Sequence, residues 1–255
     1  MLLYVDDIIC SASSKDILVE LVQYLRSLFK LKLMGVPSVL VDLPVPSQLL
    51  RLELIWGEGF KSVQINASKL VRELLKMHYK DNGTKSNKVP VDPTFKFSKN
   101  DVLVDNGDLS NADKAMQSAY RTVVGVAIFL VTMCRVDISY ATTQLARYMS
   151  KSGHRHYRAA NYLLSYLSGT VDLGIAFYNS DNKRIYAYAD SDFGSDESRR
   201  ACTGYVFILA NGPIRWKCAF SKEVPLSTCE AEVRIVSAMV EPIKDCVWID
   251  KVLDS

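Results

Sequence analysis

The sequence predicts an α+β fold. Three observations favour it: a hairpin pattern in the first ten residues, helical periodicity through the middle of the chain, and alternating strand patterns followed by a long helical stretch near residue 255. The chain is 49% hydrophobic and 23% charged, which is enough apolar content to bury a sizeable core. Its formal charge of +3 is too small to indicate a nucleic-acid partner by itself. Six widely spaced cysteines, none at zinc-ligand spacing, indicate reduced structural thiols.

Two adjacent carboxylates, Asp6 and Asp7, lie between the apolar runs 1–5 and 8–10. The pattern predicts a strand, an acidic turn and a second strand. Such a hairpin holds hard oxygen ligands at one point, which suits Mg²⁺ (or Mn²⁺) carried by phosphate substrates. An ordinary surface Asp-Asp turn explains the same tetrapeptide equally well. No basic residue precedes the run and no apolar stretch approaches the ~20 residues of a membrane span, so neither a signal peptide nor a membrane helix is expected.

The first third of the chain alternates helix and strand signals. A capping pattern at 13–16 predicts a helix whose apolar face carries residues 17, 21, 25 and 28. Prolines in 35–48 favour irregular backbone. Strands are predicted at 52–55 and 62–65, then a helix at 68–79. The polar stretch 80–112 is interpreted as a linker that contains a domain boundary.

The remainder of the chain changes from helical to strand periodicity. Helices are predicted at 113–132, 137–149 and 156–167, with Gly169 just past the end of the third. Strands are predicted at 184–189, 204–209 and 213–219. A long helix follows at 227–252, with Pro242 expected to kink it.

Carboxylates recur where this last section changes from strand to helix. Asp190 is expected at a strand end and Glu232 near the start of the long helix. Together they match the donors that a two-metal nuclease needs. Glu230 is two residues from Glu232 and points to another side of the helix, so only one of them can join Asp190. Taken alone, Asp190 is better explained as a turn residue.

Seven blocks in order carry more information than any single motif. They are 2–7 (LLYVDD), 120–125 (YRTVVG), 135–141 (RVDISYA), 166–174 (YLSGTVDLG), 188–192 (YADSD), 199–205 (RRACTGY) and 226–232 (LSTCEAE). With these blocks the chain resembles the reverse transcriptase and ribonuclease H part of a copia-type LTR retrotransposon Pol polyprotein. The resemblance covers most of the length.

The resemblance implies specific domains and metal sites. It implies a residual reverse transcriptase palm hairpin and thumb at 1–90, a linker at 91–112, a helical connection at 113–180 and an incomplete ribonuclease H-like α/β module at 181–255. By resemblance, Asp6 and Asp7 match polymerase metal ligands, and Asp190 and Glu232 match ribonuclease H carboxylates. Further carboxylates of both sites are expected to lie outside the chain. We therefore expect an inactive remnant; the alternative is a non-catalytic co-opted protein, such as a secreted host-directed effector or a nucleic-acid-binding factor.

A basic and aromatic cluster supplies candidates for nucleic-acid contact: Arg147, Lys151, Arg155 and Arg158. A solvated helix corner is the competing interpretation. By ancestry the expected partner is an RNA/DNA hybrid, with a host protein as partner if the chain is co-opted, no membrane, and self-association through exposed strand edges. An intracellular location, cytoplasm or nucleus, is the default, and secretion is expected only for a co-opted form.

Overall fold

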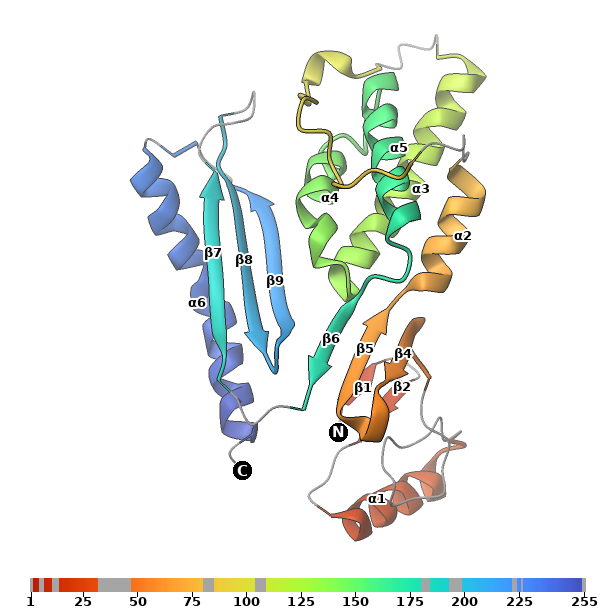
Figure 1. The fold of residues 1–255 in the computed structure, drawn as a ribbon, viewed down its shortest axis with the longest axis vertical. Coiled ribbons are helices and arrows are strands. Elements are labelled where there is room, and N and C mark those ends of the chain that lie inside the picture. Colours follow the sequence, from red (N-terminus) through yellow and green to blue (C-terminus); the bar gives the residue numbers. More distant parts are fainter. Residues whose placement is uncertain are drawn as a thin grey trace.

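A computed structural model describes residues 2–4, 7–10, 14–31, 47–79, 85–103, 109–179, 184–192, 199–221, 224–225 and 227–253. It contains helices and antiparallel sheets, which confirms the predicted α+β class. A group of helices lies on one side, and a three-stranded sheet backed by one long helix lies on the other (Figure 1). A four-stranded sheet lies below the helices.

The first ten residues contain the predicted hairpin strands. β1 (Leu2–Tyr4) and β2 (Asp7–Ile9) pair antiparallel with Tyr4 opposite Asp7. Val5 and Asp6, at the predicted turn, lie outside the described residues. α1 (Lys15–Leu28) begins where the capping pattern predicts, because the Ser14 Oγ accepts a hydrogen bond from the Ile17 amide at 3.4 Å. Most of the predicted irregular stretch, 35–46, also lies outside the described residues.

A four-stranded antiparallel sheet joins segments that are far apart in sequence. Its order is β3 (Gln48–Leu49), β4 (Leu52–Trp56), β5 (Ser62–Asn66) and β6 (Ile175–Tyr178). A 3-10 turn, η1 (Glu58–Phe60), connects β4 to β5. The predicted strands at 52–55 and 62–65 are confirmed. β6 was not predicted, because a four-residue strand has too short a pattern to be recognised before its partner β5 is known.

Four helices pack above this sheet and enclose the main core. They are α2 (Ser68–His78), α3 (Asn111–Met133), α4 (Ser139–Ala146) and α5 (His154–Gly169). The core unites residues of β4, α2, α3, α4 and α5. α3 is long and apolar enough to cross a bilayer by length and composition, yet Tyr120, Val123, Val124, Ala127 and Leu130 of this helix are fully buried in the core.

Several boundaries in this region differ from the prediction. The predicted helix at 137–149 is a 3-10 turn, η3 (Val136–Ile138), followed by the shorter α4. Gly169, predicted just past a helix end, is the last residue of α5, and a Cβ there would lie 2.2 Å from the Ser86 Oγ. That close approach explains the glycine better than backbone freedom does.

Within the predicted linker, the segment 85–103 lies against the helices. It includes the 3-10 turn η2 (Lys99–Asp101). Phe97 is only 7% exposed within the main core, and Asn87 donates to the Tyr162 carbonyl at 3.0 Å. Residues on both sides of the predicted domain boundary therefore share one core.

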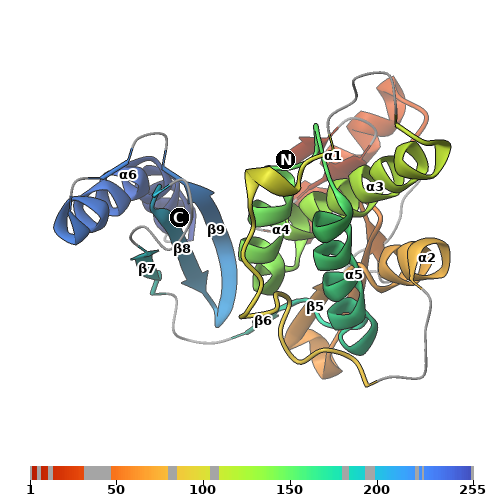
Figure 2. The same cartoon turned by 90° about the horizontal axis from the view of Figure 1, so that it is seen from above.

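The C-terminal layer is a three-stranded antiparallel sheet with one helix. β7 (Tyr186–Asp192), β8 (Cys202–Leu209) and β9 (Gly212–Phe220) pair in chain order. α6 (Thr228–Leu253) packs on β7 and β8, with Pro242 inside the helix. Viewed from above, β9 is the strand nearest the helical group, where it contacts α4 (Figure 2). This contact joins the two layers.

Candidate functional site

The N-terminal acidic pair is only partly placed. Asp7 is the first residue of β2, opposite Tyr4, whereas Asp6 lies outside the described residues. The backbone thus puts Asp7 at the tip end of the hairpin, as the sequence predicts. Its role as a metal ligand stays a prediction.

The strand register fixes which face of the C-terminal sheet carries Asp190. Asp190 lies opposite Gly204, and Gly204 lies opposite Cys218. Directly opposed residues share a face, and so do residues two apart on one strand. Trp216 therefore shares the face of Asp190, and its indole Nε1 donates to the Val131 carbonyl of α3 at 2.7 Å. Asp190 lies on the face that is turned toward α3.

The opposite face carries α6 and with it Glu232. Arg215 is next to Trp216 and so points the other way, where its guanidinium pairs with Asp245 of α6 at 2.7 Å. Glu232 lies on α6 and is exposed. The structure therefore places Asp190 and Glu232 on opposite sides of the sheet. The Asp190 carboxylate instead accepts a hydrogen bond from the Ser191 amide at 2.9 Å.

The other acids near the start of α6 do not complete a metal site. Glu230 accepts two hydrogen bonds from Arg234, the shorter at 2.7 Å. Among the described residues there is no group of three or more His, Cys, Asp or Glu that could hold a metal ion. The carboxylates that the structure describes do not fit a two-cation centre, which needs several acids converging on ions about 3.5–4 Å apart.

Two of the four candidate nucleic-acid contacts are held by neighbouring side chains. The Arg147 guanidinium lies 4.4 Å from the centre of the Phe220 ring and donates to Gln144. Arg155 pairs with Asp101 at 3.0 Å. The other two, Lys151 and Arg158, are exposed. These two make no ion pair with any residue that the structure describes.

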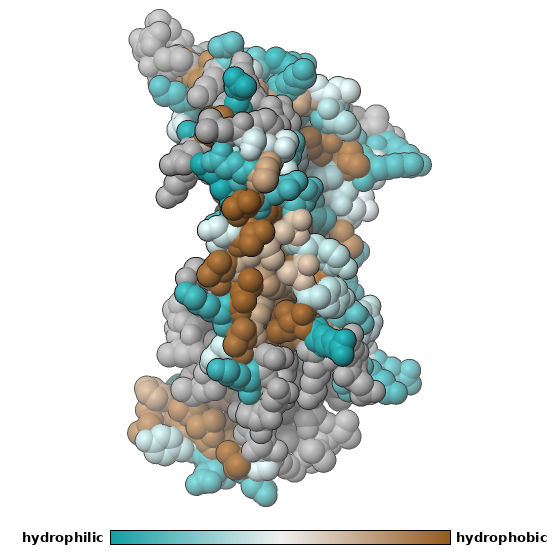
Figure 3. Space-filling view, turned by 90° about the vertical axis from the view of Figure 1, so that its left-hand side faces the viewer, coloured by the Kyte–Doolittle hydropathy of each residue, from teal (hydrophilic) through white to brown (hydrophobic). Residues whose placement is uncertain are grey.

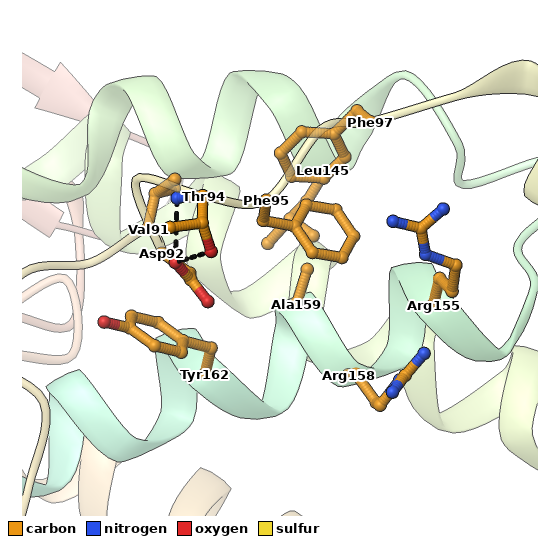
Figure 4. A pocket seen from close by; sticks show the side chains of 10 residues that line it. All are labelled: Val91, Asp92, Thr94, Phe95, Phe97, Leu145, Arg155, Arg158, Ala159 and Tyr162. Atoms are coloured by element: carbon orange, nitrogen blue, oxygen red, sulfur yellow. Dashed lines mark hydrogen bonds between the residues drawn. The ribbon is translucent and has the colours of Figure 1, made fainter.

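Arg158 lines a cavity of about 300 Å³ between α5 and the segment 91–97 (Figure 4). Its lining combines aromatic rings, two arginines and one acid: Val91, Asp92, Thr94, Phe95, Phe97, Leu145, Arg155, Arg158, Ala159 and Tyr162. Hydrogen bonds from Thr94 hold the pKa of Asp92 below its usual range, so this end of the cavity is anionic at neutral pH. The two arginines lie at the other end (Figure 4). The sequence did not predict this cavity, because its walls come from the stretch read as linker.

His154 and His156 lie on either side of Arg155 at the start of α5 and have different roles. His154 Nε2 lies 3.2 Å from Asp113 at the start of α3, a carboxylate partner that sequence proximity did not reveal. His156 is fully buried and stacks on Tyr148 with ring centres 4.0 Å apart. Its Nδ1 accepts from the Gly153 amide at 3.1 Å, and burial lowers its pKa. His156 is thus a structural cap of α5.

Cys202 and Cys218 form a thiol pair that the sequence did not predict. Their Sγ atoms are 3.6 Å apart on neighbouring strands, where β8 and β9 bring them onto the same face. The hydrogen bond from Cys202 lowers the pKa of Cys218 to about 7, while the same contact and burial raise the pKa of Cys202. Spacing in sequence could not reveal this pair because it depends on the β8–β9 register.

Known proteins similar to this chain include Pol polyproteins of plant transposons. The chain is 27% identical over 254 residues, 99% of its length, to the retrovirus-related Pol polyprotein from transposon TNT 1-94 of Nicotiana tabacum, and it spans 18% of that polyprotein. It is 26% identical over 238 residues to the uncharacterized mitochondrial protein AtMg00810 of Arabidopsis thaliana, of which it covers 90%. It is 30% identical over 131 residues to the secreted RxLR effector protein 161 of Plasmopara viticola.

These relatives define the class, a protein of transposon ancestry. More specifically, the chain is a retrotransposon Pol-derived protein. No protein-family model matches it, and no solved structure matches it.

Proposed function

We propose that the chain derives from the reverse transcriptase and ribonuclease H parts of a copia-type Pol polyprotein, and that on its own it catalyses neither reaction. The ordered sequence blocks support the first half of the proposal. So does the alignment with the TNT 1-94 polyprotein, because it runs along 99% of the chain. The finer assignment to the two enzymes rests on the motif resemblance.

The proposed inactivity rests on the separation of Asp190 from Glu232. Hydrolysis of an RNA strand by two cations requires acids that converge from one side of the fold. Here the β7–β8–β9 register and the Arg215–Asp245 ion pair put the two acids on opposite faces of the sheet. Changing the face of Asp190 requires a one-residue shift of β7, which moves every other side chain of that strand as well.

The test is primer extension and cleavage of an RNA/DNA hybrid by the purified chain, with Mg²⁺ and with Mn²⁺. We expect no turnover above background in either assay. Two variants, Asp7→Ala and Glu232→Ala, probe the proposed polymerase and nuclease remnants, and Glu73→Ala, an exposed acid on α2, is the control. Robust activity that the two site variants abolish and the control retains contradicts the proposal.

A second candidate function is nucleic-acid binding without catalysis. The cavity beside Arg158 favours it, because Phe95 and Tyr162 offer rings for stacking while Arg158 offers a cation for a phosphate. Fluorescence anisotropy with a labelled single strand and a labelled hybrid tests this candidate. We expect Arg158→Glu to weaken binding about 10-fold and to reduce its salt dependence, whereas Lys69→Glu, on α2, leaves both unchanged.

A host-directed effector is the remaining alternative, and the similarity to the RxLR effector protein 161 favours it. That similarity covers 51% of this chain. Mapping the native N-terminus and the compartment of the protein discriminates between the two readings. A processed extracellular form supports the effector and contradicts an intracellular remnant.

A further inference from the structure

α6 is apolar on two opposite sides. Ala231, Ile235 and Cys246 face the sheet and are at most 7% exposed. A second set, on the far side of the helix, is exposed by 44–64%: Val233, Val236, Val240, Ile243 and Val247. We refer to these five residues as the outer stripe. It forms a continuous hydrophobic column on that side of the molecule (Figure 3).

The spacing of the outer stripe is that of a helix-pairing seam. Its members follow one another at intervals of three, four, three and four residues, and Cys229 extends the same series by one step. This repeat of 3.5 residues is the period at which two helices keep their apolar seams in contact. All five members are β-branched, which gives the seam stiff, well-defined side chains.

We propose that the outer stripe binds the outer stripe of a second copy of this chain, with the two α6 helices antiparallel about a two-fold axis. Charges beside the stripe favour the antiparallel arrangement. Glu230, which also accepts hydrogen bonds from Arg234 of its own helix, lies at the start of α6, and Lys244 lies two turns before its end, both on the same side of the stripe. Antiparallel pairing places each Glu230 near Lys244 of the other copy, and it also opposes the helix dipoles.

The stripe has the size of a weak interface. With Trp248, which is 66% exposed beside it, the stripe presents on the order of 500 Å² of apolar surface per copy, within the range of patches that mark interaction sites. A standard stable interface covers about 800 Å² per partner. An interface of this size is typical of weak, transient association, so we expect a reversible, concentration-dependent dimer.

Sedimentation velocity of the full chain across the micromolar range is the experiment. The wild type shows a monomer–dimer equilibrium, and Val240→Glu in the middle of the stripe weakens dimerisation at least 10-fold. Met77→Glu is the matched control, because Met77 is 66% exposed on α2, away from the stripe, and its variant dimerises like the wild type. Circular dichroism verifies that both variants keep their helical content. A wild type that stays monomeric, forms only large aggregates, or dimerises equally well as Val240→Glu overturns the proposal.

Cysteine cross-linking tests the orientation. In the antiparallel register that sets Val236 against Val240, Cys229 lies opposite position 247 of the other copy. Mild oxidation of Val247→Cys by copper phenanthroline, which takes up the two electrons released per disulfide, then joins Cys229 to the new thiol between chains. Peptide mass spectrometry identifies that bond. A cross-link between the two Cys229 residues in the wild type instead overturns the antiparallel arrangement.

Discussion

The helical group and the C-terminal layer bury their apolar surfaces to different extents. In the helical group, α3 has five fully buried residues and contacts α2, α4 and α5. In the C-terminal layer, α6 covers one sheet face and leaves an apolar stripe on its other side. The helical group thus covers these apolar residues with its own helices. In the C-terminal layer, α6 has apolar side chains on two sides, and the described residues cover only one of them.

The helical group also encloses a buried ion pair. Arg135 is 1% exposed, and its guanidinium donates to both carboxylate oxygens of Asp137 and to Thr170. Asp137 also accepts from the Tyr166 hydroxyl at 2.9 Å. Four hydrogen bonds from the Arg135 guanidinium offset the cost of burying its charge. The Arg-Val-Asp block of the sequence is thus a structural pair that joins η3 to the end of α5.

The largest expected effect comes from breaking this pair. Arg135→Met removes the cation, leaves Asp137 without its partner, and should lower the free energy of unfolding by about 3–5 kcal/mol. Urea denaturation followed by circular dichroism measures it. Arg158→Met, at an exposed site, should change stability by less than about 0.5 kcal/mol. If Arg135→Met costs no more than the Arg158 control, the helical group does not depend on its buried ion pair.

A smaller and more local effect is expected in the C-terminal layer. Ile235→Ala empties a site that is 4% exposed between α6 and the sheet, at a cost of about 2–4 kcal/mol. Hydrogen exchange should accelerate in β7–β9 and α6 while α3 and α5 keep their protection. Val224→Ala, at a 46% exposed site between β9 and α6, is the control and should change exchange little. Uniform acceleration over the whole chain would show that the two regions unfold as one unit.

The contact between the helical group and the C-terminal layer should contribute less to the free energy of unfolding than the Arg135 or Ile235 sites do. Trp216→Phe removes the hydrogen bond from Nε1 to the Val131 carbonyl and should cost about 1 kcal/mol. Tyr188→Phe, at a 64% exposed site on β7, is the control. Thermal unfolding of both variants is the measurement. Equal melting temperatures for the two would mean that the Trp216 bond does not hold the layers together.

The smallest expected effect is a pH dependence located in the helical group. Burial lowers the pKa of His156 in the folded chain, so between this value and about 6.5 the unfolded chain binds more protons. Stability due to neutral His156 is therefore complete above about pH 6.5 and is lost as the pH falls through the lowered pKa. His156→Gln should flatten this part of the curve of unfolding free energy against pH, whereas His78→Gln should retain it.

Local sequence patterns predicted most elements of both regions. Alternation identified β4 and β5, and the serine cap identified the start of α1. Two elements depended on distant partners. β6 is a strand because β5 pairs with it, and the polar segment 85–103 packs because Phe97 enters a core made by other helices. Neither partner is visible in a local window of sequence.

The candidate site was predicted less completely than the fold. The resemblance identified the candidate acidic residues. The face of the sheet on which Asp190 lies follows instead from the register of β7 with β8. The cavity at Arg158 and the Cys202–Cys218 pair likewise arise from segments that meet only in the folded chain. Sequence spacing gives the order of such groups along the chain and not their distances in space.

The sequence by itself determined the ancestry, the α+β class and which sides of each element are apolar, because motifs and periodicity are properties of local segments. The tertiary structure decided what covers those sides. It buried one side of α6 and left the other exposed, and it set Asp190 and Glu232 on opposite faces of one sheet. The physical reason is that strand register and layer packing depend on contacts between distant segments, and a single step in register reverses the face of every side chain in a strand.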